Sequence, residues 1–271
     1  LKPALMAISD SHKKEDQIPE FVNGITSDRR VVKVMVELVR QRNPNGKVYI
    51  MESSGDGRTS RHLKQMGFTR ENLPGVDEII ALGEDAPYRD LDSDQLVGVR
   101  VKNQRYTKMP KWMKNQYYFD RTYHAADVII SMCCLKNHAN AAVTGGIKNV
   151  GIGAKPHNVY AMSKNKSLSL TTINHMGDNI HHFIHDYYSA KPVHFVLTDG
   201  LQGLAYGPAA LGAPSYNAAK MNMRLIMASR DAVAIDTVHS CIIGMDPKNV
   251  NYIRDLSDDR SGIMATRRID I

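Results

Sequence analysis

The chain has little cysteine: only Cys133, Cys134 and Cys241 among 271 residues. An odd count of three cannot build a disulfide framework and is typical of a reducing compartment, so we expect a cytoplasmic protein. No two of these cysteines are separated by two residues, and their number excludes an iron–sulfur cluster held by four cysteines of this chain. This absence weakens the case for direct electron transfer.

Long hydrophobic runs are also absent. No apolar stretch reaches the roughly 18 residues that a membrane helix needs, which predicts that the chain has no membrane span. The first residues, Leu1 to Met6, contain neither an initiator methionine nor a signal-peptide pattern. We therefore expect the chain to begin inside a longer protein, whose missing part would carry any export signal.

Charge of one sign is not concentrated anywhere, although the chain is basic overall. The formal net charge is +7 and the pI about 9.2, a balance that favours acidic ligands. Lysine and arginine are spread along the sequence, with no arginine-rich arm, zinc-finger spacing or helix-turn-helix pattern. We expect a small anionic ligand and no nucleic acid. The alternative is a solvated basic surface.

The first half of the chain shows an α/β order of elements. Thr26-Ser27-Asp28 offers N-cap residues to a helix near 28–42, and a strand over 47–52 is followed by a loop at 53–60 and a short helix at 61–66. A strand or short helix is expected at 77–82. Strand, loop and helix in that order form half of a βαβ unit.

The second half repeats this alternation. We expect strands over 127–132, 193–197 and 224–229, and helices ending at Tyr188 and spanning 231–243. The fold class predicted is α/β, with two interleaved lobes over 1–125 and 126–271 and largely parallel or mixed sheets. Residues 83–125 are interpreted as an insertion or a segment joining the lobes.

The segment from Leu135 to Gly153 carries the strongest functional signal. It follows the predicted strand at 127–132, and the carboxyl ends of such strands bind ligands in open α/β sheets. Its four glycines permit positive φ and let backbone N–H groups approach a ligand, while Lys148 and His138 add a cation and a titratable imidazole. We predict an anion-binding, glycine-rich loop; the alternative is a simple connection with a solvated lysine. The predicted binding residues are Lys136, Thr144, Gly145, Gly146, Lys148, Asn149 and Gly151.

A second anion cradle is suggested by residues 53–60. Serine and glycine N–H groups precede a predicted helix start there, and the positive end of a helix favours negative charge. The segment lacks the G-x-G-x-x-G pattern. An ordinary strand-to-helix turn is therefore the alternative.

Acidic and histidine side chains supply further candidates. Asp199 follows a predicted strand, and Asp236 interrupts an apolar helix face and must have a partner, with His239 or Lys148 as candidates. With His138 and Lys148, these two acids are the predicted catalytic residues. A further group of side chains lies on one face of a predicted helix. It is either a metal site or a set of solvated histidines: His175, Asp178, His181, His182 and His185.

Several of these segments together resemble a known family. The motifs are residues 135–138, residues 143–149, Thr198-Asp199-Gly200 with the glycines and proline that follow, and residues 231–236. In that order they resemble the domain of unknown function 362, and the likeness extends over nearly the whole chain. Members of that family are often linked to ferredoxin-like iron–sulfur modules. The resemblance therefore implies a ferredoxin-like redox partner.

A more distant motif is similar to that of lactate racemase. That enzyme has a histidine, a Gly-Tyr-Ser-Gly-Gly segment and a lysine that holds a nickel-containing, nucleotide-derived cofactor. His138, residues 144–146 and Lys148 match in type, order and spacing. The resemblance implies that Lys148 anchors a cofactor and His138 transfers protons. Lys164 stands where a nickel-binding histidine is expected, which leaves His157 and His175 as candidate metal ligands.

Two functions from different classes follow. The first is an enzyme that acts on a small anionic substrate by proton or hydride movement between His138 and Lys148, with racemase-like, epimerase-like or related redox chemistry. The second is a non-catalytic accessory or binding component of an iron–sulfur redox system. An enzyme needs a proton-transfer group and a charge stabiliser at fixed geometry, whereas a binding module needs only complementarity.

Overall fold

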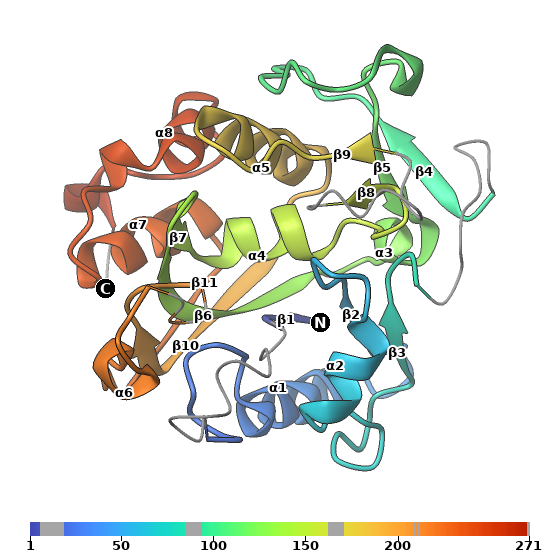
Figure 1. The fold of residues 1–271 in the computed structure, drawn as a ribbon. Coiled ribbons are helices and arrows are strands. Elements are labelled where there is room, and N and C mark those ends of the chain that lie inside the picture. Colours follow the sequence, from blue (N-terminus) through green and yellow to red (C-terminus); the bar gives the residue numbers. More distant parts are fainter. Residues whose placement is uncertain (6–18, 85–93, 162–170, 209, 211, 270–271) are drawn as a thin grey trace.

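A mixed sheet lies at the centre of the protein (Figure 1). The structure, a computed structural model, describes residues 1–5, 19–84, 94–161, 171–208, 210 and 212–269. The sheet has the order β1-β6-β10-β11, formed by β1 (Lys2–Pro3), β6 (Ile130–His138), β10 (Phe195–Leu204) and β11 (Leu225–Ser229). β1, β6 and β10 are parallel, β11 is antiparallel to β10, and β7 (Ala142–Thr144) folds back on β6. The predicted α/β class with mixed sheets is confirmed.

A smaller parallel sheet, formed by β2 (Tyr49–Glu52) and β3 (Glu78–Ala81), lies beside β1. The backbone of Leu1 joins the two sheets, because Met51 N donates to the Leu1 carbonyl (3.0 Å) and the Leu1 amino group donates to the Tyr49 carbonyl (2.7 Å). The two parts of the chain therefore meet at β1, which pairs with β6. The predicted division into lobes 1–125 and 126–271 stays a prediction.

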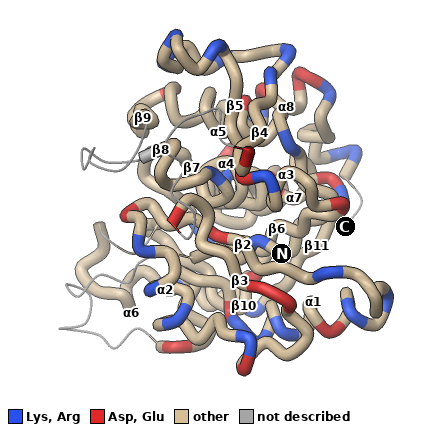
Figure 2. The backbone as a smooth tube through the Cα atoms, turned by 90° about the vertical axis from the view of Figure 1, so that its right-hand side faces the viewer, with Lys and Arg blue, Asp and Glu red and all other residues tan. Residues whose placement is uncertain are grey.

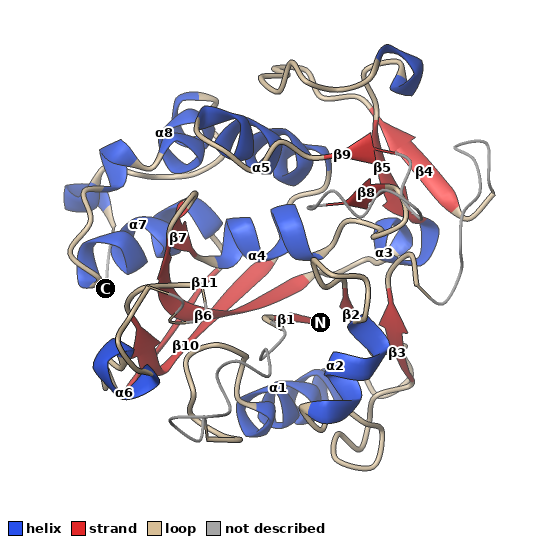
Figure 3. Ribbon diagram, in the orientation of Figure 1, coloured by secondary structure: helices blue, strands red, loops and turns tan. Residues whose placement is uncertain are grey.

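Helices cover both faces of the central sheet (Figure 3). On one face lie α1 (Arg29–Arg42) and α2 (Thr59–Gln65), over a core that includes Val36 and Ile50. On the other face lie α4 (Gly146–Gly153) and α7 (Ala232–Ile242), with α5 (Asp178–Ala190) and α8 (Asn251–Asp258) packed outside them. Within the described ranges, no helix combines the length and apolar character needed to cross a membrane.

The predicted secondary structure agrees with most of these elements. The Asp28 carboxylate caps α1 by accepting from Arg30 N (2.9 Å), as the N-cap pattern predicted. Asp231 caps α7 in the same way, accepting from Ala234 N (2.9 Å). The strand predicted over 127–132 runs further than expected and ends at His138, because its fully buried continuation pairs with β10.

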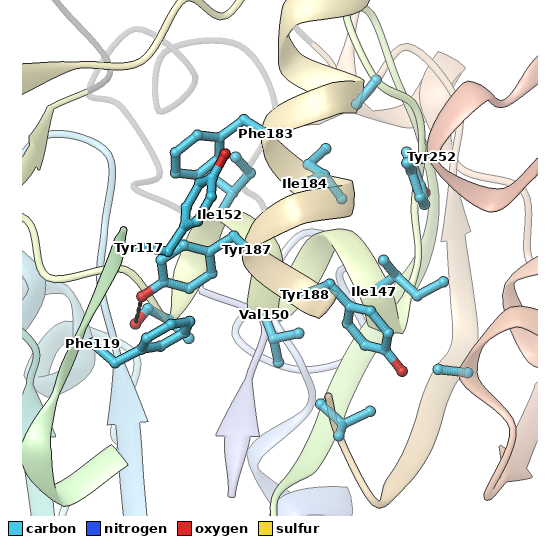
Figure 4. Packing of buried hydrophobic residues seen from close by; sticks show 14 of the residues in the cluster. Tyr117, Phe119, Ile147, Val150, Ile152, Phe183, Ile184, Tyr187, Tyr188 and Tyr252 are labelled. Atoms are coloured by element: carbon cyan, nitrogen blue, oxygen red, sulfur yellow. Dashed lines mark hydrogen bonds between the residues drawn. The ribbon is translucent and has the colours of Figure 1, made fainter. Parts of the chain in front are cut away.

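Residues 94–125 form a small unit that covers α5. β4 (Leu96–Val99) and β5 (Tyr117–Asp120) are antiparallel. The Phe119 ring of β5 contacts the Tyr187 ring of α5 at a tilt of 36°, with centroids 4.2 Å apart (Figure 4). This part of the predicted insertion is thus packed into the main core. The remaining short elements are η2 (Lys111–Met113), α3 (Arg121–Ala125), β8 (Tyr160–Ala161), β9 (Thr171–Thr172), α6 (Tyr216–Ala219), η3 (Pro247–Asn249) and η4 (Thr266–Arg268).

The glycine-rich part of the segment, Gly146–Gly153, is the helix α4, and its prediction as a loop was wrong. None of its glycines has a positive φ. They are needed because α4 is enclosed between β6, β10 and α5: a Cβ at Gly146 would lie 2.4 Å from Val196 Cγ1, and one at Gly151 would lie 3.1 Å from Ile184 Cγ2. Val150 of α4 is buried beside α5 (Figure 4). Close packing explains these glycines.

This packing predicts that Gly146→Ala destabilises the protein by about 1–3 kcal/mol, since the new methyl group must displace Val196. Gly212→Ala is the matched control, because among the described residues a Cβ there meets only the Tyr206 ring, at 3.7 Å. Denaturant unfolding of both variants measures the difference. Equal stability of the two variants would contradict the close approach of α4 to β10.

Candidate active site

A pocket of about 200 Å³ opens beyond the short strand β1, between the carboxyl ends of β2 and β6. Ligands of open α/β sheets bind at such strand ends. β1 is only two residues long, and Ala4 and Leu5, which follow it, reach the pocket together with side chains from the neighbouring strands. The pocket is lined by Lys2, Ala4, Leu5, Glu52, Ser53, Gly55, Lys136, His138, Thr144, Lys148, Asn149, Ile152, Gly153, His175 and Pro208.

Three buried lysines line this pocket: Lys2, Lys136 and Lys148. Glu52 is the only carboxylate among the lining residues. Buried lysines are rare without partners, because removing an ammonium group from water is costly. Lys and Arg residues are distributed over the whole backbone, with Asp and Glu residues among them (Figure 2). In the pocket lining, three lysines face one glutamate, which leaves an excess of positive charge.

Two of the three ammonium groups are held by the protein. Lys2 Nζ forms an ion pair with Glu52 Oε2 (2.7 Å) and donates to Asn149 Oδ1 (2.8 Å). Lys136 Nζ donates to the Ile25 carbonyl (2.5 Å). Burial lowers the pKa of both lysines. They are therefore fixed parts of the pocket wall.

Lys148 differs from both. It is 7% exposed, and in the described parts of the chain no atom accepts a hydrogen bond from its Nζ. Burial, and then the positive charges of Lys136 and Lys2, lower its pKa to about 7. A cation without an acceptor, facing a cavity, has the arrangement of a ligand-binding or reactive group.

The pKa of Glu52 is shifted in the opposite direction to that of Lys148. Burial raises the pKa of its carboxyl group to about 7, against the opposing effect of Lys2. Protonated and ionised forms of both Glu52 and Lys148 thus coexist near neutral pH. Groups with a pKa near the working pH are the most effective in proton transfer.

His138 is held neutral rather than poised to titrate near neutrality, as the unperturbed value would suggest. Burial, and next the charge of Lys148, lower its pKa far below the ordinary value. Its Nδ1 accepts from Asn140 N (3.1 Å) and Ala141 N (3.2 Å), so the proton of the neutral ring lies on Nε2. His138 can therefore donate a hydrogen bond to a ligand.

Other polar groups of the pocket lack partners. Thr144 Oγ1, Ser53 Oγ and His175 Nδ1 are buried, and none has a hydrogen-bond partner within the described ranges. The His175 ring lies edge-on to His138, with centroids 5.6 Å apart, and burial lowers its pKa to about 4. Buried polar groups normally form hydrogen bonds, so this concentration in one cavity points to a ligand.

The predicted binding residues divide into two groups. Lys136, Thr144, Lys148 and Asn149 line the pocket, as does His138. The three predicted glycines, Gly145, Gly146 and Gly151, do not line it, because protein atoms fill the space beside them. A Cβ at Gly145 would lie 2.3 Å from the Asp236 carboxylate, and the packing of Gly146 and Gly151 is described above.

Asp236 occupies the place predicted for an anionic ligand. Its carboxylate accepts from Gly146 N (2.7 Å) and Ile147 N (3.0 Å), and so caps the N-terminus of α4. Burial raises its pKa to about 7. The expected pairing with His239 or Lys148 was wrong, since His239 Nε2 accepts from Lys136 N (3.1 Å) instead.

Asp199 and Asp236 both lie outside the pocket lining. Asp199 Oδ2 accepts from Asp28 N (2.7 Å), so it fixes the start of α1. Asp236 fixes the start of α4 and thereby positions Lys148. The structure thus brings together His138 and Lys148 but not the two acids predicted to act with them.

The predicted metal ligands are not assembled either. His175 lines the pocket, whereas His157 packs against Gly57 and Gly83. His185 contacts Asp186 (2.7 Å) and Asp259 (2.9 Å). Over the described ranges, no group of three or more His, Cys, Asp or Glu side chains is placed to hold a metal ion. Lys164 lies outside the described residues, and the nickel-containing or nucleotide-derived cofactor stays a prediction.

In the second predicted anion site, residues 53–60, several backbone N–H groups donate to protein side chains instead of being free for an anion. Ser54 N donates to Thr59 Oγ1 (2.9 Å), and Arg58 N donates to Asp56 Oδ1 (3.2 Å). Ser60 N donates to Glu84 Oε2 (3.1 Å). Only the start of this segment, at Ser53 and Gly55, reaches the pocket.

Lys2 and Glu52 were missed by the sequence analysis. Each is a charged residue within or at the end of a short apolar strand, where a charge must have a partner. That is the signal by which they could have been found. Gly153 allows them to meet, because a Cβ there would lie 2.2 Å from Lys2 Nζ.

Most of the chain matches a known protein family. The family described as Domain of unknown function (DUF362) matches residues 16–240. The chain belongs to the DUF362 family. Its matched range holds every pocket-lining residue from Glu52 to Pro208, whereas Lys2, Ala4 and Leu5 precede it. No curated protein and no solved structure matches the chain. The description of this family names no activity.

Proposed function

We propose that this protein is an enzyme that binds a small organic acid in the lysine pocket and transfers a proton on it. The observation that carries the proposal is the Lys148 ammonium, buried in the pocket wall without an acceptor. A carboxylate placed beside Lys148 would supply that acceptor. It would also reduce the excess of three lysines over one glutamate in the pocket lining.

The polar groups of the pocket suit such a ligand. His138 Nε2–H and the Thr144 hydroxyl are available as neutral donors, and Lys136 and Lys2 provide a positive potential. The cavity of about 200 Å³ is smaller than the roughly 300–1,000 Å³ typical of drug-sized ligands. Its size favours an acid of a few carbon atoms over a dinucleotide.

An enzyme is favoured over a binding module because two groups of opposite type titrate near neutrality. Lys148 as a free amine accepts a proton, and Glu52 as a carboxylic acid donates one. A module that only binds an anion gains nothing from a lysine that loses its charge at pH 7. Proton transfer next to a carboxylate is the chemistry of racemases and epimerases, which the sequence motif predicted.

The test is isotope exchange. Protein purified under native conditions is incubated in deuterated water with 2-hydroxy and 2-oxo acids, and deuterium on carbon is measured by mass spectrometry. We expect incorporation into at least one acid, and a rate lower by about 10²–10⁴-fold in Lys148→Met. Lack of exchange in every acid that binds would show that the pocket only binds its ligand.

A further inference from the structure

We propose that Lys148 is a nucleophile and that the substrate is a small 2-oxo acid, which Lys148 holds as a Schiff base. This inference rests on the proposed function, because it assigns a substrate class to the same pocket. It goes further in giving Lys148 a covalent role. Four lysines are buried in the described residues: Lys2, Lys136, Lys148 and Lys155.

Three of the four are tied to acceptors. Lys2 is held by Glu52 and Asn149, Lys136 by the Ile25 carbonyl, and Lys155 Nζ donates to the Tyr160 carbonyl (2.8 Å). A lysine with a structural role is fixed in this way. Lys148 alone of these four has no acceptor among the described residues, and it lines a cavity. A nucleophilic amine needs this freedom, because its lone pair must reach a carbon atom of the substrate.

The surroundings also favour the neutral amine, which is the reactive form. Lys148 lies near two other cations, Lys136 and Lys2, and a desolvated lysine beside another cation is a known way to activate an amine. Glu52 is the only acid that faces it across the pocket. The remaining titratable groups of the lining, His138 and His175, stay neutral at pH 7.

A 2-oxo acid meets both demands of the pocket. Its carbonyl carbon is the electrophile for Lys148, and its carboxylate gives the cations of the wall a counter-charge. His138 Nε2–H and the Thr144 hydroxyl are donors for that carboxylate. An aldehyde or ketone without an acidic group would leave the positive charge of the pocket uncompensated.

The reaction needs no oxidant or reductant. The Lys148 lone pair attacks carbon 2, the C=O bond opens, and its oxygen takes a proton from the Glu52 carboxylic acid. The nitrogen of this carbinolamine loses a proton to Glu52. The hydroxyl group then takes that proton from Glu52 and leaves as water while the nitrogen lone pair forms the C=N bond, and the protonated imine returns one proton to Glu52. The net change is amine plus ketone to imine plus water.

The experiment traps the imine. The protein is incubated with pyruvate or 2-oxoglutarate and sodium cyanoborohydride, and the label is located by peptide mass mapping of the wild-type chain. We expect one adduct per chain, on Lys148 and not on Lys155. Malonate, which has no ketone, should compete. Below pH 7 the trapping rate should increase about tenfold with each unit of increasing pH, because it follows the fraction of neutral amine.

Calorimetry with malonate separates the two proposals. If malonate binds but no adduct forms on Lys148, the Schiff base is overturned and the acid-binding pocket stands. If malonate does not bind and no adduct forms, both proposals fall. Labels spread over surface lysines, unchanged by malonate, would also overturn the inference. Lys148→Arg should abolish the adduct and Lys155→Arg should keep it.

Discussion

Lys148→Met is expected to lower exchange activity by about 10²–10⁴-fold and to make the protein more stable by about 1–3 kcal/mol at pH 7. The native side chain is buried without an acceptor and is repelled by Lys136 and Lys2. Methionine keeps the aliphatic stem and removes the charge. Functional groups that are unfavourable for folding are common in active sites, where they are retained for their reactivity.

The stability gained in Lys148→Met is expected to decrease as the pH rises above 7. The pKa of Lys148 is lowered from 10.5 to about 7 in the folded protein. Between these values the unfolded chain binds one more proton than the folded chain, so wild-type stability rises with pH. The destabilisation by Lys148 is therefore complete below about pH 7 and fades toward pH 10.5. Urea unfolding at pH 6, 7 and 9 should show the advantage of Lys148→Met shrinking at the highest pH.

Lys155→Met is the control for this result. Lys155 is also buried with a pKa lowered to about 7 by burial, but it donates to Tyr160 O and lies outside the pocket lining. Its removal leaves a buried carbonyl without its donor, so we expect a smaller gain or a loss of stability, with activity retained. A Lys148→Met protein that is less stable than wild type at pH 7, or still active, would refute the role given to Lys148.

Asp236→Ala is expected to destabilise the protein by about 2–4 kcal/mol and to weaken acid binding. The substitution leaves Gly146 N and Ile147 N without their acceptor inside the core. It also opens a space beside Gly145. Because α4 carries Lys148 and Asn149, loosening its first turn moves two pocket residues. Denaturant unfolding and malonate calorimetry measure the two effects.

Asp231→Ala is matched to it in chemistry but not in burial. Asp231 also accepts two backbone hydrogen bonds, from Ala234 N and Ile263 N (both 2.9 Å), but it is only half-buried at the start of α7. We expect a loss of about 1 kcal/mol, typical of a helix cap, and unchanged binding. Equal losses of stability in the two variants would mean that burial of the Asp236 cap adds nothing to the stability that a half-buried helix cap provides.

Local patterns were sufficient to predict much of the fold. N-cap residues mark the start of α1 and α7, and alternating apolar runs mark β2, β10 and β11. Such signals depend on a few neighbouring residues, so they are readable without tertiary structure. The same holds for the position of His138 and Lys148 after a buried strand, and both residues line the pocket.

Local patterns could not predict the structure of the glycine-rich segment. Four glycines and a lysine are compatible with an anion-binding loop or with a closely packed helix. The choice depends on Asp236, which is 90 residues away from Gly146 and takes the N–H groups that a ligand would use. Only the tertiary structure brings that carboxylate to α4.

The sequence by itself determined the α/β class, the family and the choice of His138 and Lys148 as pocket residues, because these depend on local periodicity and motif order. Tertiary structure decided which residues share the pocket. Lys2 meets Asn149 across 147 residues, and Glu52 joins them where β2 ends beside β1. Burial then sets their charges, since the pKa of a lysine or glutamate depends on water and charges contributed by distant segments.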